Sequence, residues 1–121
     1  MNDDMRAKGM KVRREVLGDA HVDRAEAATT AFTAEFQDLL TRHAWGEIWT
    51  RPGLDRRMHS CITIAMLVGL GREEELRVHL RGALNNGVTR DEIKEILLQA
   101  AVYCGLPAAN AAFRIASELL A

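Results

Sequence analysis

The stretch GREEELRVHLRGALNNGVTRDEIKEILLQAAVYCGLPAANAAF, residues 71–113, carries the start and stop signals of three consecutive helices. The first helix is expected over residues 72–85, because the three glutamates near its start suit the positive end of a helix dipole. Gly87 follows two asparagines and is placed to take the left-handed conformation that ends a helix. This stretch therefore predicts a helical fold.

The second and third helices of this stretch have equally clear boundaries. Thr89 and Glu92 form a capping box, which predicts a helix that begins there and ends at Gly105. Pro107 suits the first turn of the next helix, because that position needs no backbone N–H. The apolar residues of both helices recur at helical spacing: Ile93, Ile96, Leu97, Ala100, Ala101 and Cys104 in the second, and Ala108, Ala111, Ala112, Ile115 and Leu119 in the third.

The preceding part of the chain predicts further helices. The first is expected over residues 4–17, with Gly18 as its stop and residues 18–23 as a connector. The second runs from about residue 24 or 30 to 43, and a compact turn region over 44–57 with both tryptophans follows it. The apolar stripe of this second helix consists of Phe32, Phe36, Leu39, Leu40 and His43.

A helix from Asp55 to Leu70 completes the expected set. Asp55 is a good N-cap, and residues 61–70 are apolar on nearly every face, so this should be the central buried helix. With only two prolines and no sustained alternation of period two, the chain is predicted to be all-α, with six helices. So many alanine faces offer more apolar surface than a monomer can hide, and oligomers are therefore expected.

The length and charge of the chain limit the classes of protein to which it can belong. The 121 residues fit one domain over 1–121, with an N-terminal helix and connector over 1–22 and a core over 30–121. The net charge of −1 argues against nucleic acid as the main partner. No apolar run approaches the ~18 residues that a membrane span needs, and the charged N-terminus is unlike a secretory signal. A cytoplasmic location is therefore expected.

The two cysteines, Cys61 and Cys104, are expected to be buried free thiols. Neither belongs to a Cys-x-x-Cys pair, and a reducing compartment disfavours a disulfide. The chain also lacks a set of closely spaced ligands for structural zinc, so no metal site is predicted.

One polar group within residues 71–113 is a candidate site for chemistry. Arg72, Glu75 and His79 are spaced by three and four residues, so they share one helix face. That face borders an apolar stripe of Leu76, Leu80, Ala83 and Leu84. A histidine beside a core stripe is by itself more often a hydrogen-bonded structural residue, and glutamates 73–75 also suit a helix N-terminus.

The chain resembles the carboxymuconolactone decarboxylase family, which has the all-helical alkylhydroperoxidase D-like fold. The resemblance is strongest in LDRR, residues 54–57, and in EEELRVHLRGALNNGVTRDEIKEILLQAAVYCGLPAANAAF, residues 73–113. It extends through WGEIWTRPGLDRR and KGMKVRREVLGDAHVD and so covers essentially the whole chain. The resemblance implies an all-α homo-oligomer, a hexamer, with sites between subunits as a possibility, and a lyase that needs no cofactor.

The peroxidase branch of the same fold carries Cys-x-x-Cys-x-x-x-His on this helix and a glutamate on the preceding helix. The two cysteine positions are Arg72 and Glu75 in this chain. The glutamate position is Ser60, and only the histidine is retained, as His79. Without the thiol pair, peroxidase chemistry of that kind is not expected. A redox enzyme of this fold and a non-catalytic helical oligomer stay open as alternatives.

The resemblance implies decarboxylation of 4-carboxymuconolactone to 3-oxoadipate enol-lactone, in protocatechuate catabolism by the beta-ketoadipate pathway. This substrate is an unsaturated five-membered lactone with a carboxylate on its gamma carbon and an acetate arm. The electrons that carbon dioxide leaves behind can delocalise onto the lactone carbonyl oxygen, so no cofactor or metal is required. The enzyme must hold the acetate carboxylate, stabilise the oxyanion and protonate the carbon alpha to the carbonyl.

The resemblance also suggests roles for particular residues. His79 is expected to donate to the lactone oxyanion, and Glu75 or Glu47 to protonate carbon if burial keeps it protonated. Arg51 or Arg72 is expected to clamp a carboxylate through two-point contacts. The remaining candidates are Trp45, Trp49 and Tyr103 as walls that exclude water, His43 facing the same pocket, and His21 and His59 as further histidines.

Two of these pairs also have simpler explanations. Glu47 and Arg51 are four residues apart, which suits an exposed ion pair worth ~0.3–0.5 kcal/mol. Trp45 and Trp49 are four apart as well, and large aromatic residues more often pack in a core than line a substrate site.

Overall fold

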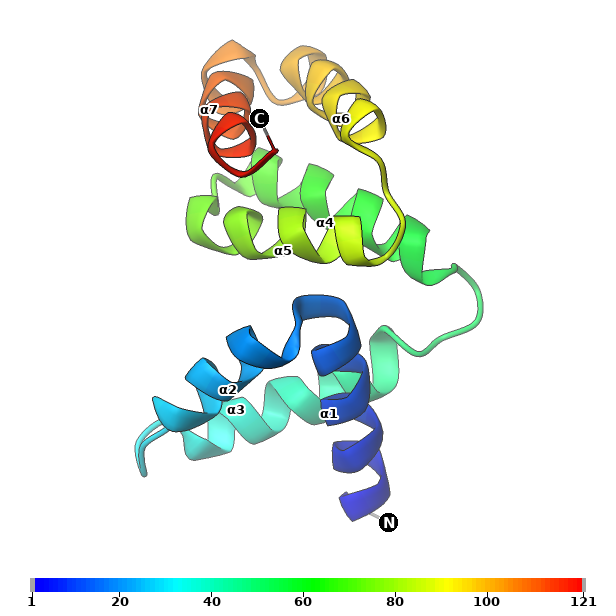
Figure 1. The fold of residues 1–121 in the computed structure, drawn as a ribbon, viewed down its shortest axis with the longest axis vertical. Helices are drawn as coiled ribbons and strands as arrows, with labels where there is room; N and C mark the ends of the chain where they lie inside the picture. The colour runs from blue at the N-terminus through cyan, green and yellow to red at the C-terminus, as the bar shows by residue number, and fades with distance from the viewer. Residues whose placement is uncertain (1, 121) are drawn as a thin grey trace. The chain divides into compact units, whose positions relative to one another are not determined.

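The computed structural model of the protein describes residues 2–120, and all of its regular secondary structure in that range is helical. Within residues 2–120, seven α-helices and one π-helical segment follow one another (Figure 1). The chain divides into two compact units, Met1–Leu54 and Asp55–Ala121, each described by itself below. No helix within residues 2–120 combines the length and the apolar character needed to cross a membrane.

The first unit contains α1 (Asn2–Leu17), α2 (Asp19–Ala27), α3 (Ala34–Leu40) and the π-helical segment η1 (Thr41–Ile48). The all-α prediction is confirmed, but six helices is too few. The residues expected to connect two helices, 18–23, instead begin α2. Gly18 ends α1 as predicted, with a φ of 91°, and the chain turns there directly into α2. Val22 is fully buried in this unit, so tertiary packing favours a helix at a place where the sequence reads as a connector.

α1 packs closely against η1, and two glycines make this approach possible. A β-carbon on Gly9 would overlap the carbonyl oxygen of Thr41. One on Gly46 would lie 2.6 Å from the carbonyl oxygen of Met5. Neither position can therefore carry a side chain unless a helix moves. A small core surrounds this crossing and consists of Val12, Val16 and Trp45, with Leu17, Leu40, Ala44 and Trp49 packed against it.

The structure corrects the helix that was predicted to run from residue 24 or 30 to 43. α3 begins only at Ala34, after a turn in which the Thr33 hydroxyl accepts a hydrogen bond from the Thr30 backbone N–H at 2.9 Å. The helix then continues as η1 to Ile48, so residues 44–48 of the predicted turn region are helical. π-helical segments are uncommon and frequently lie near functional sites.

The apolar stripe predicted for this helix is mostly exposed. Phe32 is 95% exposed, Phe36 62% and Leu39 59%, whereas Leu40 packs against the small core. Helical spacing identifies an apolar face but does not say what covers it, and nothing in residues 4–54 covers this one. The stripe is therefore an open apolar surface of the single chain.

The second unit contains α4 (Arg56–Leu70), α5 (Glu73–Asn85), α6 (Arg90–Tyr103) and α7 (Leu106–Leu120). α4 and α5 lie side by side in one layer, and α6 and α7 pack across them in another (Figure 1). The predicted boundaries are confirmed to within one or two residues. The Asp55 side chain accepts a hydrogen bond from the Met58 backbone N–H at 2.8 Å, and Thr89 with Glu92 forms the complete capping box.

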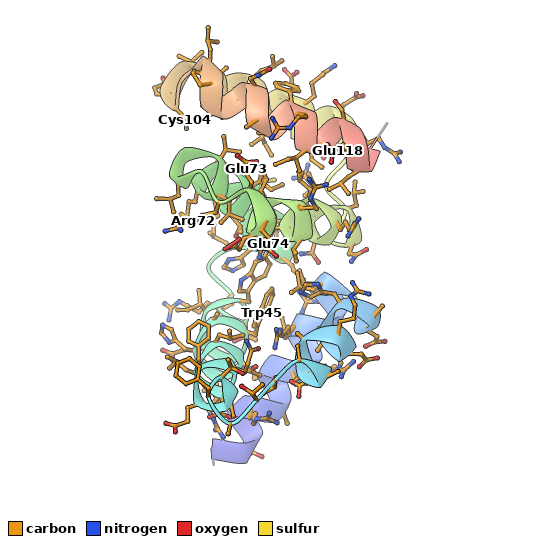
Figure 2. The ribbon with its side chains drawn as sticks, turned by 90° about the vertical axis from the view of Figure 1, so that its left-hand side faces the viewer. Trp45, Arg72, Glu73, Glu74, Cys104 and Glu118 are labelled. Atoms are coloured by element: carbon orange, nitrogen blue, oxygen red, sulfur yellow. The ribbon has the colours of Figure 1, made fainter. Side chains whose placement is uncertain are left out.

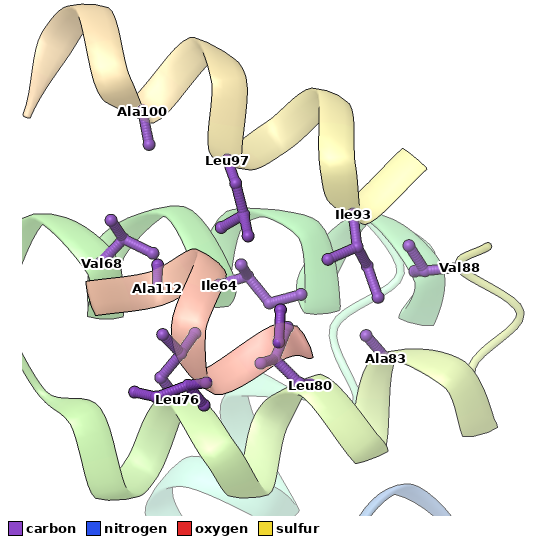
Figure 3. Packing of buried hydrophobic residues seen from close by; sticks show 12 residues of the cluster. Ile64, Val68, Leu76, Leu80, Ala83, Val88, Ile93, Leu97, Ala100 and Ala112 are labelled. Atoms are coloured by element: carbon purple, nitrogen blue, oxygen red, sulfur yellow. The ribbon is translucent and has the colours of Figure 1, made fainter. Parts of the chain in front are cut away.

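The core of the second unit lies between its two layers. Ile64, Leu80 and Leu97 have no exposed surface and meet near its centre (Figure 3). The other buried members of this cluster are Val68, Leu76, Ala83, Val88, Ile93, Ala100, Ala112, Ile115 and Ala116. The apolar positions that the sequence assigned to α5, α6 and α7 supply most of this core, which fixes the orientation of α5 and its polar face.

α4 is not the buried central helix that its sequence suggested. Within residues 61–70, Ile64 and Val68 are buried, but Met66 and Leu70 are exposed. The prediction that both cysteines are buried is also wrong, because Cys104 is exposed and Cys61 half-buried, although both are free as expected. An all-apolar helix needs cover on every face, and in the single chain one face of α4 has none.

Candidate active site

The candidate residues of the first unit lie in η1 and just after it. The rings of Trp45 and Trp49 are stacked, with centroids 4.8 Å apart and planes inclined by 25°. Trp45 is buried in the small core of this unit, and Trp49 packs beside it. The geometry therefore gives Trp45 a packing role, and the π-helical turns of η1 bring the two rings together.

His43 and Glu47 are neighbours on the surface of η1. The Nδ1 atom of His43 lies 3.4 Å from a carboxylate oxygen of Glu47, and both side chains are more than half exposed. Glu47 is therefore open to solvent and is not enclosed by apolar side chains. Glu47 pairs with His43 and not with Arg51, which is exposed and makes no ion pair with the described residues up to 54.

The polar group of the second unit occupies the start of α5. Arg72 is the N-cap residue, with φ −89° and ψ 78°, and its side chain makes no capping hydrogen bond. Glu75 follows in the first turn and His79 one turn later, on the shared face that their spacing predicts. Arg72 and Glu75 are exposed, whereas His79 is half-buried and its Nδ1 atom is inaccessible to solvent. The protein therefore encloses the histidine more than it encloses its two neighbours.

The charges at the start of α5 differ in their partners. Glu73 projects toward α7, where a carboxylate oxygen lies 3.1 Å from a guanidinium nitrogen of Arg114 (Figure 2). Arg72 makes no ion pair with any described carboxylate of residues 55–120. The first-turn N–H groups add partial positive charge at the same place. A ligand carboxylate can therefore pair with Arg72 without displacing a side chain of this unit.

Ser60 occupies the position at which the peroxidase branch keeps its glutamate. Its side chain is 1% exposed, and its hydroxyl oxygen accepts a hydrogen bond from the Asn86 amide at 2.9 Å. This bond ties α4 to the end of α5 near His59, which is also buried. A neutral hydroxyl held in this way supports the fold and supplies no acid or base.

Arg13 is a buried polar residue that the sequence did not single out. It lies on α1, 5% exposed, and its guanidinium donates hydrogen bonds to the Thr41 hydroxyl at 3.5 Å and to the Gln37 side chain at 3.4 Å. Burial lowers the pKa of Arg13, and the negative charge of the nearby Glu26 partly offsets this shift. No sequence signal separates Arg13 from the other basic residues of this helix, because the two acceptors come from elements far along the chain.

Tyr103 lies apart from Arg72. It is 82% exposed and lines a groove of about 540 Å³ between α4 and α6, together with Met58, Cys61, Ile62, Ala65, Ile96, Gln99, Ala100 and Cys104. Arg72 lines a different pocket, with Leu76 and the alanines of α7, and no residue lines both. The structure thus brings Arg72, Glu75 and His79 together on one helix and leaves Tyr103 on another surface.

Comparisons with known proteins find a matching family and several similar decarboxylases. The model of the carboxymuconolactone decarboxylase family matches residues 34–118. The 4-carboxymuconolactone decarboxylase of Acinetobacter baylyi is 53% identical over 98% of this chain and 90% of that protein. Nitrosuccinic acid decarboxylase npaB of Metarhizium robertsii is 50% identical over 83% of this chain and 70% of its own. A 4-carboxymuconolactone decarboxylase of Pseudomonas putida is 59% identical over 32% of this chain and 81% of its own.

Proposed function

Because the chain belongs to the carboxymuconolactone decarboxylase family, we propose that it converts 4-carboxymuconolactone to 3-oxoadipate enol-lactone without a cofactor. The observation that carries this proposal is the 53% identity, over nearly the whole chain, to a relative of that name. The reaction would belong to protocatechuate catabolism, in the beta-ketoadipate pathway. Arg72 and Glu75 occupy the two positions at which the peroxidase branch has cysteines. This replacement favours carboxylate chemistry over thiol chemistry.

The substrates in the names of two relatives have the same kinds of functional group. Each is an acid with a second carboxylate and a group that accepts electrons, the lactone carbonyl in one and the nitro group in the other. In both, the electron pair that stays behind when carbon dioxide leaves can delocalise onto this electron-accepting group. A protein of this kind needs to bind one carboxylate, stabilise the growing negative charge and supply a proton.

The start of α5 offers side chains for these three tasks. We assign the carboxylate contact to Arg72 and the donor for the developing oxyanion to His79, which is the more enclosed of the two. Glu75 shares their face and remains the carboxylic acid closest in sequence to His79. Glu47 and Glu75 are both exposed in the single chain, but the Glu47 carboxylate lies 3.4 Å from His43, so Glu75 is the better choice for the proton donor.

A direct assay tests the proposed reaction. The purified protein is expected to release carbon dioxide from 4-carboxymuconolactone at the same rate with and without a metal chelator. Release should be measured manometrically while the loss of the lactone is followed by chromatography. No release above the buffer rate would contradict the proposal, and thiol-dependent peroxide consumption that disappears in Cys104→Ser would support the redox alternative instead.

We further propose that the protein acts in the cytoplasm as a homo-oligomer, a hexamer. Exposed apolar side chains gather on α4 and α6 and at the start of α7, and they include Met66, Leu98, Val102 and Leu106. Monomeric proteins rarely leave such faces open, and a second copy of the chain offers the same apolar chemistry. The exposed stripe of α3 adds a further surface of this kind.

Charge placed on the α6 face should disrupt this assembly. Val102→Glu is expected to lower the mass measured by sedimentation, because an oligomer would have to bury the new carboxylate. Ser117→Glu adds the same charge at an exposed polar position of α7 and serves as the control. A native protein that sediments as a monomer, or a Val102→Glu variant with unchanged mass, would rule out this surface as the interface.

A further inference from the structure

A pocket of about 260 Å³ opens at the end of the second unit where α5 and α7 begin. Three helices form its walls, and the lining residues are Leu67, Val68, Gly71, Arg72, Glu73, Leu76, Pro107, Ala108, Ala111 and Ala112. One water occupies about 30 Å³ in the liquid, so this space has room for a small carboxylic acid, such as one arm of a larger substrate, and not for a drug-sized ligand. We call it the Arg72 pocket.

Small residues create this space. Ala108, Ala111 and Ala112 form the α7 wall, and Gly71 contributes no side chain where α4 ends. Small side chains on a helix can let a neighbouring helix approach closely. On this side of α7 they instead leave room beside Leu76, so the floor of the pocket is apolar.

Arg72 carries the only uncompensated charge among the lining residues of this pocket. The other charged lining residue, Glu73, is paired with Arg114 at 3.1 Å. Glu74 and Glu75 are exposed and are not part of the lining. The pocket therefore combines an apolar floor with one free guanidinium at its edge, which is the chemistry that recognises a small carboxylic acid.

The reaction itself decides which carboxylate such a guanidinium should hold. In decarboxylation, negative charge leaves the departing carboxylate and moves to the electron-accepting group. A strong ion pair to the departing carboxylate would stabilise the substrate more than the transition state and slow the reaction. An ion pair to the retained carboxylate keeps its strength throughout, so it positions the substrate without this penalty.

We propose that the Arg72 pocket binds the retained acetate arm of the substrate, with its carboxylate on Arg72 and its carbon atoms on the alanine wall. This inference rests on the proposed decarboxylase function. His79 follows Arg72 by seven residues, about 10 Å of helix rise, on the same face. A substrate held by its arm at the end of α5 thus extends its ring along the helix toward the histidine.

Binding of an unreactive acid tests the pocket separately from catalysis. The probe is the lactone acetate that lacks the ring carboxylate, titrated by calorimetry. Arg72→Ala is expected to weaken its binding about tenfold or more, since a charge-assisted pair is lost. Ala111→Leu is expected to do the same by filling the pocket while all charges stay. The matched control Arg81→Ala, an exposed arginine of α5 outside the lining, should bind like the native protein.

Turnover of 4-carboxymuconolactone supplies the second readout. Arg72→Ala and Ala111→Leu should raise KM by a larger factor than they lower kcat, because they weaken contacts that are equally strong in the bound substrate and in the transition state. Native-like probe affinity in both variants would overturn the pocket assignment, even if the protein releases carbon dioxide. Conversely, probe binding that depends on Arg72 and on Ala111 in a protein that releases none would support the pocket and contradict the proposed function.

Discussion

His79→Ala is expected to slow carbon dioxide release from 4-carboxymuconolactone by about 10²-fold or more. The variant loses the half-buried side chain proposed to donate to the lactone oxyanion. Charge appears on that oxygen only as the carbon–carbon bond breaks, so the donor acts mainly in the transition state. The loss should therefore appear in kcat as well as in kcat/KM, measured by steady-state kinetics.

A neighbouring substitution separates this effect from damage to the helix. Val78→Ala truncates another half-buried residue of α5 and should keep activity within a few-fold of native. Far-UV circular dichroism and sedimentation should show the same helix content and mass for both variants. Turnover near the native rate in His79→Ala would remove His79 from the mechanism.

Gly9→Ala is expected to destabilise the first unit. In an open helix this change is favourable by about 0.5–1 kcal/mol, because alanine is the better helix former. Here the new β-carbon overlaps the Thr41 carbonyl oxygen and lies 2.9 Å from the Gly46 backbone nitrogen. Overpacking typically costs about 1–3 kcal/mol, and backbone atoms cannot rotate away as a side chain can. The clash should therefore outweigh the gain in helix propensity.

Urea unfolding followed by tryptophan fluorescence measures this effect, since both tryptophans lie in the first unit. The control is Gly53→Ala, where a β-carbon meets nothing within 4 Å and the backbone is not left-handed. Its midpoint should stay close to the native value. A Gly9→Ala protein as stable as the native one would show that α1 and η1 do not cross as closely as described.

The second unit was largely predictable from the sequence because its signals are local. The capping box at Thr89 and the left-handed Gly87 act within a few residues of the helix ends that they mark. The shared face of Arg72, Glu75 and His79 follows from helical spacing for the same reason. The spacing leaves open how enclosed each side chain is, which depends on the helices packed against α5.

The first unit was less predictable because its structure depends on contacts across the chain. α2 forms where the sequence suggests a connector, and its one buried residue, Val22, explains why. The Phe32 and Phe36 stripe has perfect helical spacing and yet faces solvent in the single chain. Tyr103 is predicted as an aromatic wall of the site, but it lines the groove between α4 and α6, because the type of a residue does not determine the surface on which its side chain lies.

The position of Arg72 has a consequence for how substrate choice changes in such a scaffold. Arg72 precedes α5 and follows Gly71, whose φ is 70°, whereas His79 lies inside the helix. The backbone of a turn can adjust while the helix keeps its register. The reach of the cation can thus be altered at the turn without moving the histidine. Laboratory evolution toward new dicarboxylic acids would accordingly begin with residues 71–72 and the facing alanines.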